Sequence, residues 1–217
     1  MPGERRQIVG RHYEVDGKLY PSVTTILSII RKPYLERWRG EIGNDDADFI
    51  MEEAGELGSE VHNIAEAISR GDKWGATDPA IQVMGAALEE WFAANVEQVI
   101  ATEQFVFDPL YCYAGRLDLI AIIKGDPRPS IIDFKTGGVW PEAFLQLAAY
   151  KHACQEDILR RVVLHIDKKN PGKITAKDAP NDFETDWRMF LYCLELFRYF
   201  NKSEPRKSQI IKIKRGK

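Results

Sequence analysis

GRLDLIAII (residues 115–123) and SIIDFK (residues 130–135) are the two stretches that decide the fold of this chain. Both are rich in apolar and β-branched residues, and the turn-forming segment GDPRP lies between them, which predicts a pair of adjacent strands. Each strand nevertheless contains an aspartate, Asp118 in the first and Asp133 in the second. A charge in an apolar strand is costly unless it is paired or binds something. The two aspartates are therefore the first candidates for a functional site.

Asp133 and Lys135 are expected to share one face of the second strand. Side chains alternate along a strand, so Ile132 and Phe134 point to the opposite face, and two strand rises separate Asp133 from Lys135 by roughly 7 Å. The Asp-x-Lys pattern also occurs at 16–18 and 167–169, but both of those copies lie at expected turns, where charges are solvated. The copy at 133–135 is the one that lies within an apolar strand.

A hairpin built from these two strands brings Asp118 and Asp133 side by side. Two close carboxylates repel each other, and one of them stays protonated unless a cation neutralises the pair. Oxygen ligands favour Mg²⁺ or Mn²⁺. The alternative is purely structural, a buried ion pair of either aspartate with Lys135 or Arg116. At this point both interpretations stay open.

Outward from the hairpin, the pattern predicts helices packed around a sheet, an α/β or α+β fold. Before the two strands we expect a hairpin in HYEVDGKLY (12–20), a short helix capped by Ser22, helices over 51–69 and from Pro79, and a strand at 101–107. After them we expect a helix from Pro141 to about 155, a strand at 161–166 and a last helix carrying Trp187 to Phe197. The chain is expected to form one domain over 1–217, with a hairpin and helices in 1–50, the core in 51–200 and a basic tail in 201–217.

Composition adds limits on location and partners. The three cysteines are scattered, no apolar run reaches the length of a membrane span, and the first residues lack the apolar centre of a signal peptide, so we expect a soluble, cytoplasmic protein with no membrane partner. The net charge is −3, yet residues 41–60 hold eight acids and residues 206–217 hold six bases. The tail and the bases around Arg31–Arg39 either bind phosphate backbones or are simply solvated.

Two residue pairs at helical spacing extend the candidate site. Gly58 and His62 are four residues apart on one expected helix, and Gln146 and Tyr150 are four apart on another, so each pair shares a face. A glycine permits close backbone approach, and a neutral imidazole can ligate a metal. Each pair alone also has an ordinary explanation, because a lone histidine is often packed or exposed and amphipathic helices produce Gln-x-x-x-Tyr freely.

Taken in order, these elements resemble the RecB-like branch of the PD-(D/E)xK nucleases. The resemblance rests on GSEVH (58–62), Glu103, GRLD (115–118), IIDFKTG (131–137) and QLAAY (146–150). It implies a restriction-endonuclease-like core with a central mixed sheet and an N-terminal helical elaboration. It also implies that His62, Asp118, Asp133 and the backbone carbonyl of Phe134 ligate metal, and that Lys135 positions or activates the attacking water.

The same resemblance assigns the remaining candidates. Gln146 and Tyr150 match the substrate-side and structural pair of the branch, and Gly58 and Arg116 are candidates for contact with substrate. Glu103 matches an acidic catalytic position, although a solvent-facing strand glutamate would fit the sequence as well. The chain departs from the pattern at Leu117, where the proline that names the superfamily is absent. Its three dispersed cysteines cannot supply the four-cysteine iron–sulfur cluster of some relatives.

The activity implied is Mg²⁺-dependent hydrolysis of DNA by an exonuclease, with Mn²⁺ as a substitute, in phage or host recombination or repair. YPSVTTIL (20–27) is similar to the opening of the mitochondrial genome-maintenance exonuclease and its phage-encoded relatives. Expected partners are single- or double-stranded DNA ends, a single-strand-binding or annealing protein, and further copies of the chain. The alternatives are a structure-selective endonuclease, the nuclease partner of a separate helicase, and an inactive DNA-binding protein. The sequence contains no P-loop and therefore no helicase motor.

Overall fold

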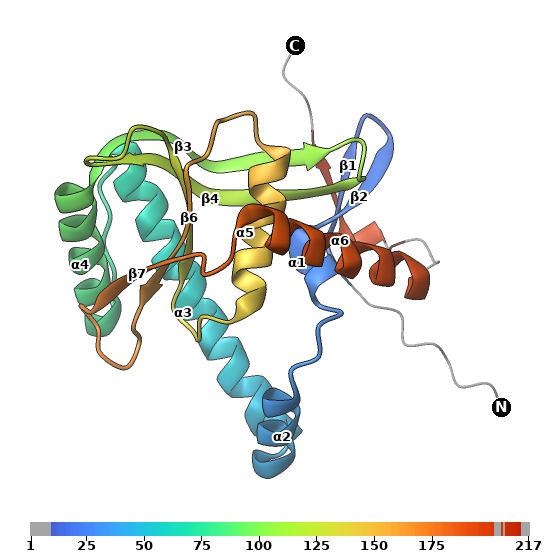
Figure 1. The fold of residues 1–217 in the computed structure, drawn as a ribbon. Helices are drawn as coiled ribbons and strands as arrows, with labels where there is room; N and C mark the ends of the chain where they lie inside the picture. Colours follow the sequence, from blue (N-terminus) through green and yellow to red (C-terminus); the bar gives the residue numbers. More distant parts are fainter. Residues whose placement is uncertain (1–9, 202–204, 206, 214–217) are drawn as a thin grey trace.

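The computed structural model describes residues 10–201, 205 and 207–213, and its centre is a five-stranded mixed sheet (Figure 1). The strands lie in the order β3-β4-β5-β6-β7, with the bounds β3 Val96–Asp108, β4 Tyr113–Ile123, β5 Ser130–Lys135, β6 Arg160–Ile166 and β7 Ile174–Asp178. All neighbours are antiparallel except β5 and β6, which are joined by helix α5 (Pro141–Ala153). The predicted mixed sheet and its α/β class are confirmed.

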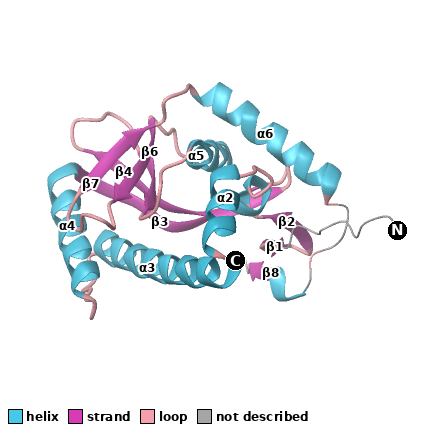
Figure 2. Cartoon of the chain, turned by 90° about the horizontal axis from the view of Figure 1, so that it is seen from below, coloured by secondary structure: helices cyan, strands magenta, loops and turns pink. Residues whose placement is uncertain are grey.

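Helices cover both faces of this sheet (Figure 2). Helices α3 (Asn44–Arg70) and α4 (Pro79–Asn95) pack on one face, and α1 (Val23–Leu27), α5 and α6 (Phe183–Phe200) pack on the other. Strand β5 shows the predicted alternation directly. Ile131 belongs to the core beneath α5 and α6, whereas Ile132 and Phe134 belong to the core beneath α3 and α4.

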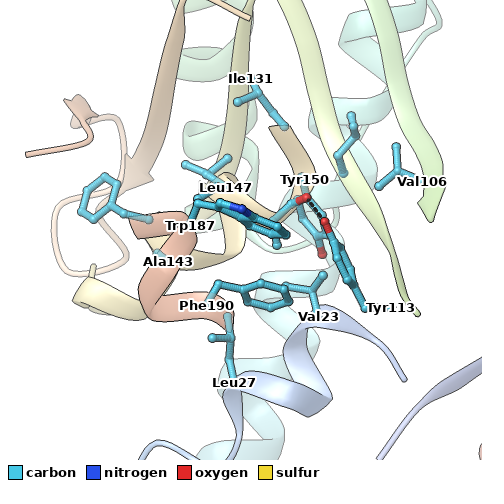
Figure 3. Packing of buried hydrophobic residues seen from close by; sticks show 14 of the residues in the cluster. Val23, Leu27, Val106, Tyr113, Ile131, Ala143, Leu147, Tyr150, Trp187 and Phe190 are labelled. Atoms are coloured by element: carbon cyan, nitrogen blue, oxygen red, sulfur yellow. Dashed lines mark hydrogen bonds between the residues drawn. The ribbon is translucent and has the colours of Figure 1, made fainter. Parts of the chain in front are cut away.

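The core under α5 and α6 is built from interlocking aromatic rings (Figure 3). Tyr113 of β4 packs edge-on to Phe190 of α6, with ring centroids 5.0 Å apart, and Trp187 stacks on Phe190 at 5.6 Å. The buried Tyr113 hydroxyl donates to the Ala149 carbonyl of α5 at 2.8 Å. Rings of this size dominate core energetics, so the contact fixes α5 against β4. The stripe on the last helix is therefore core, as its spacing predicts.

A second, three-stranded sheet contains the predicted N-terminal hairpin. Its strands are β1 (His12–Val15), β2 (Lys18–Pro21) and β8 (Ile210–Ile213), in the order β2-β1-β8. Asp16 and Gly17 form the turn with φ of 51° and 77°, the left-handed angles that Asp-Gly favours. Ser22 caps α1 by accepting from the Thr25 N–H at 3.1 Å, as expected.

Helix α2 (Pro33–Ile42) is one of the helices expected in 1–50 without bounds. Strands β7 and β8 were not predicted, and α3 begins at Asn44 rather than near residue 51. The first half of α3 is mostly exposed, so it carries little apolar periodicity, although Asp45 and Asp46 in its first turn suit a helix N-terminus. Strand β8 falls within the expected basic tail, and of that tail's bases, residues 202, 206, 214, 215 and 217 lie outside the described residues.

The Arg161–Asp186 pair joins β6 to α6 inside the protein. Their charged groups are 2.6 Å apart and both side chains are buried, and the guanidinium also donates to the carbonyls of Phe144 and Asn181. Removing one partner of such a pair leaves an uncompensated buried charge. Among the described helices, none has the length and apolarity needed to cross a bilayer.

Asp186→Ala is therefore expected to lower the free energy of unfolding by about 3–5 kcal/mol. The control is Asp157→Ala, which removes the partner of Arg128 from an exposed pair and should change it by less than about 1 kcal/mol. Urea denaturation followed by circular dichroism measures both. Equal effects of the two substitutions would contradict the assigned role.

Candidate active site

Three carboxylates lie in a row across three neighbouring strands. The β3–β4 register pairs Thr102 with Leu119 and Gln104 with Leu117, which sets Glu103 opposite Asp118. The β4–β5 register ends at the pair Leu119 and Ile132, one residue short of Asp118 and Asp133. The hairpin predicted from the sequence therefore brings the two aspartates together, and the neighbouring strand adds the carboxylate of Glu103.

Strands β4 and β5 stop pairing just before they reach Asp118 and Asp133. The Phe134 N–H donates to Asp118 Oδ2 at 2.8 Å, so a side chain of β4 takes the place of a backbone partner. Burial raises the pKa of the Asp118 carboxyl well above its usual value, and the nearby Asp133 charge raises this pKa further. Two carboxylates forced together in this way form a site that favours an added positive charge.

Glu103 reaches the site from an unusual backbone conformation. Its φ is 50°, in the left-handed region that residues other than glycine seldom adopt, and such strain is typical of functional sites. Burial and the neighbouring Glu66 raise the pKa of the Glu103 carboxyl. Arg116 lies 3.8 Å from Glu103 and is half-exposed, so it only partly offsets this charge.

His62, a residue of α3, faces the carboxylates of the site. Its Nε2 lies 2.9 Å from the Phe134 carbonyl oxygen. A carbonyl can only accept, so Nε2 donates and the Nδ1 lone pair is left facing Asp118 Oδ2 at 3.5 Å. Burial lowers the pKa of the imidazole, which keeps it neutral near neutral pH. Two facing electron-pair donors are stable together only with a cation or a proton between them.

The residues present fit a divalent metal ion. One ligand atom each from His62, Glu103 and Asp118 can be chosen so that all three lie within 4.8 Å of one another. A mixed set of one imidazole nitrogen and carboxylate oxygens suits first-row divalent ions and Mg²⁺. This trio includes Glu103, whose role the sequence left open. The Phe134 carbonyl accepts from His62, and its expected role as a direct metal ligand stays a prediction.

Asp133 is neutralised by residues of the chain itself. Gln146 Nε2 donates to Asp133 Oδ1 at 2.8 Å, and Lys135 Nζ lies 2.6 Å from Asp133 Oδ2. Burial alone would lower the pKa of Lys135, but the charges of Asp133 and Asp118 outweigh it and raise this pKa, so the ammonium persists. The structural alternative, an ion pair at Asp133, is thus present. This ion pair does not neutralise Asp118 or Glu103, so it does not account for the rest of the cluster.

Gly115 has a role that the sequence did not reveal. A Cβ at this position would lie 2.4 Å from Cε1 of Tyr150, so the missing side chain is what lets the ring pack beside the GRLD strand. Burial, followed by the charges of Asp118 and Asp133, raises the pKa of the Tyr150 hydroxyl well above its usual value. Gly58 is less constrained, because a Cβ there would make only an ordinary contact, 3.4 Å from Thr136 Oγ1.

These side chains line a cleft of about 490 Å³. His62, Glu103, Arg116, Asp118, Asp133, Lys135, Gln146 and Tyr150 all contribute to its surface. The N-terminal segment supplies part of the wall through Arg11, Tyr13, Ser22 and Thr24. Sequence reasoning missed this contribution, since it treated the N-terminal hairpin as separate from the site.

The sequence profile of the PD-(D/E)XK nuclease superfamily matches residues 74–207, well over half of the chain and including Asp118, Asp133 and Lys135. The chain belongs to the PD-(D/E)XK nuclease superfamily. Members of this superfamily are hydrolytic nucleases that use divalent metals, and its name describes the acidic pair and lysine found here. The match begins after His62, so the place of the histidine in this superfamily member rests on the geometry above.

No curated protein matches the chain. Among solved structures, the chain is similar to one described as the crystal structure of SSO0001, with a TM-score of 0.40 and 18% identity over 79% of this chain and 74% of that chain.

Asp118→Asn tests the electrostatics of the cluster. A raised carboxyl pKa means that the folded protein binds this proton more tightly than the unfolded chain, so the metal-free protein loses stability as pH rises from about 4 through the folded pKa of Asp118. The substitution keeps an acceptor for the Phe134 N–H and removes the charge. We expect the metal-free variant to be more stable than the wild type at neutral pH, by on the order of 1 kcal/mol.

Urea denaturation in EDTA at several pH values measures the effect, and Asp157→Asn, at an exposed position, is the control. Added Mg²⁺ should stabilise the wild type more than Asp118→Asn, because a ligand stabilises only a folded state that binds it. The same pH dependence in both proteins would count against the assignment.

Proposed function

We propose that this nuclease is a Mg²⁺-dependent DNA exonuclease of the RecB-like branch. The observation that carries the proposal is the row of Glu103, Asp118 and Asp133 across three strands, with His62 on one side and Lys135 on the other. The branch is supported by the order of motifs from GSEVH to QLAAY, which the fold brings into one cleft.

His62, Glu103 and Asp118 would hold the metal, with Asp133 as a further ligand. A bound divalent ion supplies Lewis acidity, which lowers the pKa of a water and offsets charge on the phosphate. Carboxylate-rich sites of this kind favour Mg²⁺ and accept Mn²⁺. His62 contributes as a neutral ligand because the Phe134 carbonyl fixes its tautomer.

Lys135 would position the attacking water as an ammonium. In the metal-free site the charges of Asp133 and Asp118 raise the pKa of Lys135, and an ammonium there donates to the water or to a phosphate oxygen. Gln146 holds Asp133, and through it Lys135, in place. Arg116, half-exposed at the cleft, is placed to contact a phosphate. Hydrolysis would leave 5′-phosphate and 3′-hydroxyl ends, as in the related nucleases.

Exonuclease action is favoured over site-specific cleavage by the similarity of YPSVTTIL (20–27) to the opening of known exonucleases. Outside the central sheet and the helices that cover it, the described chain contains the small sheet and α2, and the small sheet contributes to the cleft wall. A structure-selective endonuclease, a nuclease that works with a separate helicase, and an inactive DNA-binding protein are the alternatives. Partnership with a single-strand-binding or annealing protein, assembly into a homo-oligomer, and a role in phage or host recombination or repair stay predictions.

Asp133→Ala and Lys135→Ala should each slow Mg²⁺-dependent cleavage by at least about a hundredfold, because they remove charge that acts on the reacting phosphate. DNA binding in EDTA should stay close to that of the wild type. Lys169→Ala is the matched control, since it belongs to another Asp-x-Lys sequence at an exposed turn, where the Lys169 backbone N–H donates to the Asp167 carboxylate. Cleavage by Asp133→Ala at the wild-type rate would show that the assignment is wrong.

One Mg²⁺ time course separates the exonuclease from its alternatives. The substrates are end-labelled linear single-stranded DNA, linear double-stranded DNA and circular DNA. An exonuclease degrades the linear forms and leaves the circles intact. Loss of the circles at a comparable rate would favour an endonuclease, and no loss of any substrate in Mg²⁺ or Mn²⁺ would favour an inactive DNA-binding protein.

A further inference from the structure

Helix α6 is apolar on two sides. Its inner side, which includes Trp187 and Phe190, packs in the core beneath it (Figure 3). A second set of apolar side chains on the same helix stays exposed, and we call this set the outer stripe: Met189, Tyr192, Leu196, Tyr199 and Phe200. A surface helix normally carries polar residues on its outer side. The outer stripe therefore needs an explanation that the core does not supply.

The outer stripe is continuous along the helix. Successive residues of an α-helix are rotated by about 100°, so its five side chains fall within an arc of roughly 100°. The rest of the solvent-facing arc carries the exposed charges of the helix: Glu184, Arg188, Glu195 and Arg198. The solvent side of α6 is thus divided lengthwise into an apolar half and a charged half.

The outer stripe is large enough to form an interface. Tyr192 is 57% exposed and Phe200 is 61% exposed. Single exposed apolar residues are common, whereas a contiguous patch of them is typical of a binding surface. The stripe exposes on the order of 500 Å². Two such stripes packed together would bury about 1,000 Å² in total, which is the lower limit for a specific protein interface.

The order of residues in the outer stripe is complementary to itself. Met189 lies three residues before Tyr192, and Leu196 lies four residues after it. When two copies of α6 lie antiparallel about a two-fold axis at Tyr192, the two Tyr192 rings meet. Leu196 of each copy then packs on Met189 of the other. Such a contact uses the same surface on both copies and closes at two subunits.

The charges beside the stripe obey the same symmetry. Arg188 lies four residues before Tyr192 and Glu195 lies three residues after it, on the side where the stripe meets the charged half. In the antiparallel pair, Arg188 of each copy faces Glu195 of the other. Glu195 also accepts from Arg198 at 2.9 Å, but that pair is exposed and therefore weak. This charge complementarity identifies a second copy of the chain as the occupant of the stripe.

The position of α6 leaves the catalytic cleft open in such a pair. Figure 2 shows α6 at the outer margin of the molecule. The lining of the cleft that holds His62, Asp118 and Lys135 contains no residue of α6. Both copies in the pair would therefore keep an accessible cleft.

We infer that the outer stripe of α6 is the contact through which two copies of the chain form an antiparallel, two-fold dimer. The inference concerns a surface outside the catalytic cleft, and it does not depend on the proposed exonuclease activity. Because the area is near the lower limit for a specific interface, the dimer is reversible, with a Kd in the micromolar range.

Sedimentation velocity over a range of protein concentrations tests the dimer. The mass of the wild type should rise with concentration from near 24.8 kDa toward twice that value. Leu196→Glu places a charge inside the contact and should raise the dimer Kd by at least about tenfold. Ile50→Glu on α3 is the matched control and should leave the Kd unchanged, since Ile50 is 44% exposed and Leu196 is 49% exposed.

Exchange of charge between copies tests the antiparallel arrangement. Arg188→Glu and Glu195→Arg each create two like-charge contacts in their own dimer, so each variant alone should dimerise more weakly than the wild type. Mixed in equal amounts, the two variants have opposite charges at both contacts. They should form a mixed dimer with a Kd close to that of the wild type. A defect in folding would not be repaired by mixing, and circular dichroism of each variant checks its fold.

Three results would overturn the inference. The first is a wild type that keeps the mass of one chain at every concentration, as expected if a different protein covers the stripe. The second is a Leu196→Glu variant that dimerises like the wild type. The third is a mixture of the charge variants that associates no more tightly than either variant alone. DNA cleavage per chain by Leu196→Glu should equal that of the wild type, so the dimer and the nuclease activity are tested separately.

Discussion

The hydrogen bond from the Phe134 N–H to Asp118 Oδ2 lies at the point where β4 and β5 stop pairing, and the site depends on that separation. Had the strands continued in register, backbone bonds would have filled the space, and the carboxylates would have met across a closed ladder. The Asp118 side chain instead satisfies the free N–H and stays buried as it does so. The neighbouring Phe134 carbonyl is left to orient His62. This local break in the sheet thus fixes the positions of both the Asp118 carboxylate and the His62 imidazole.

The cluster then divides into two electrostatic halves. Asp133 has its charge matched by Lys135 and its Oδ1 held by Gln146, while its buried Oδ2 has no hydrogen-bond partner among the described residues and is open to a metal ion. Among the described residues, Glu103, Asp118 and His62 have no comparable cation, since Arg116 is half-exposed and 3.8 Å from Glu103. The raised carboxyl pKa values and the lowered imidazole pKa belong to this second half. An ion pair accounts for the first half, and a metal ion accounts for the second.

The sequence predicted the parts of this arrangement that follow from strand periodicity. Asp118, Asp133, Lys135 and the opposite placement of Phe134 follow from alternation in two apolar strands, and the fold confirms them. The position of Glu103 depends on an unusual backbone angle, and the contact of Gly115 with Tyr150 depends on how α5 crosses the sheet, so neither has a local signal. Strand β8 was missed for the same reason, because its partner β1 lies at the other end of the chain.

That last pairing has a consequence for how the protein is made. His12 of β1 finds Ile210 as its parallel partner only after the chain has been synthesised as far as β8. Contacts so distant in sequence form late, after the loop-closure entropy has been overcome. Strand β1 also carries Tyr13, which lines the catalytic cleft. The small sheet, which supplies part of the cleft wall, is therefore complete only after β8 has joined β1.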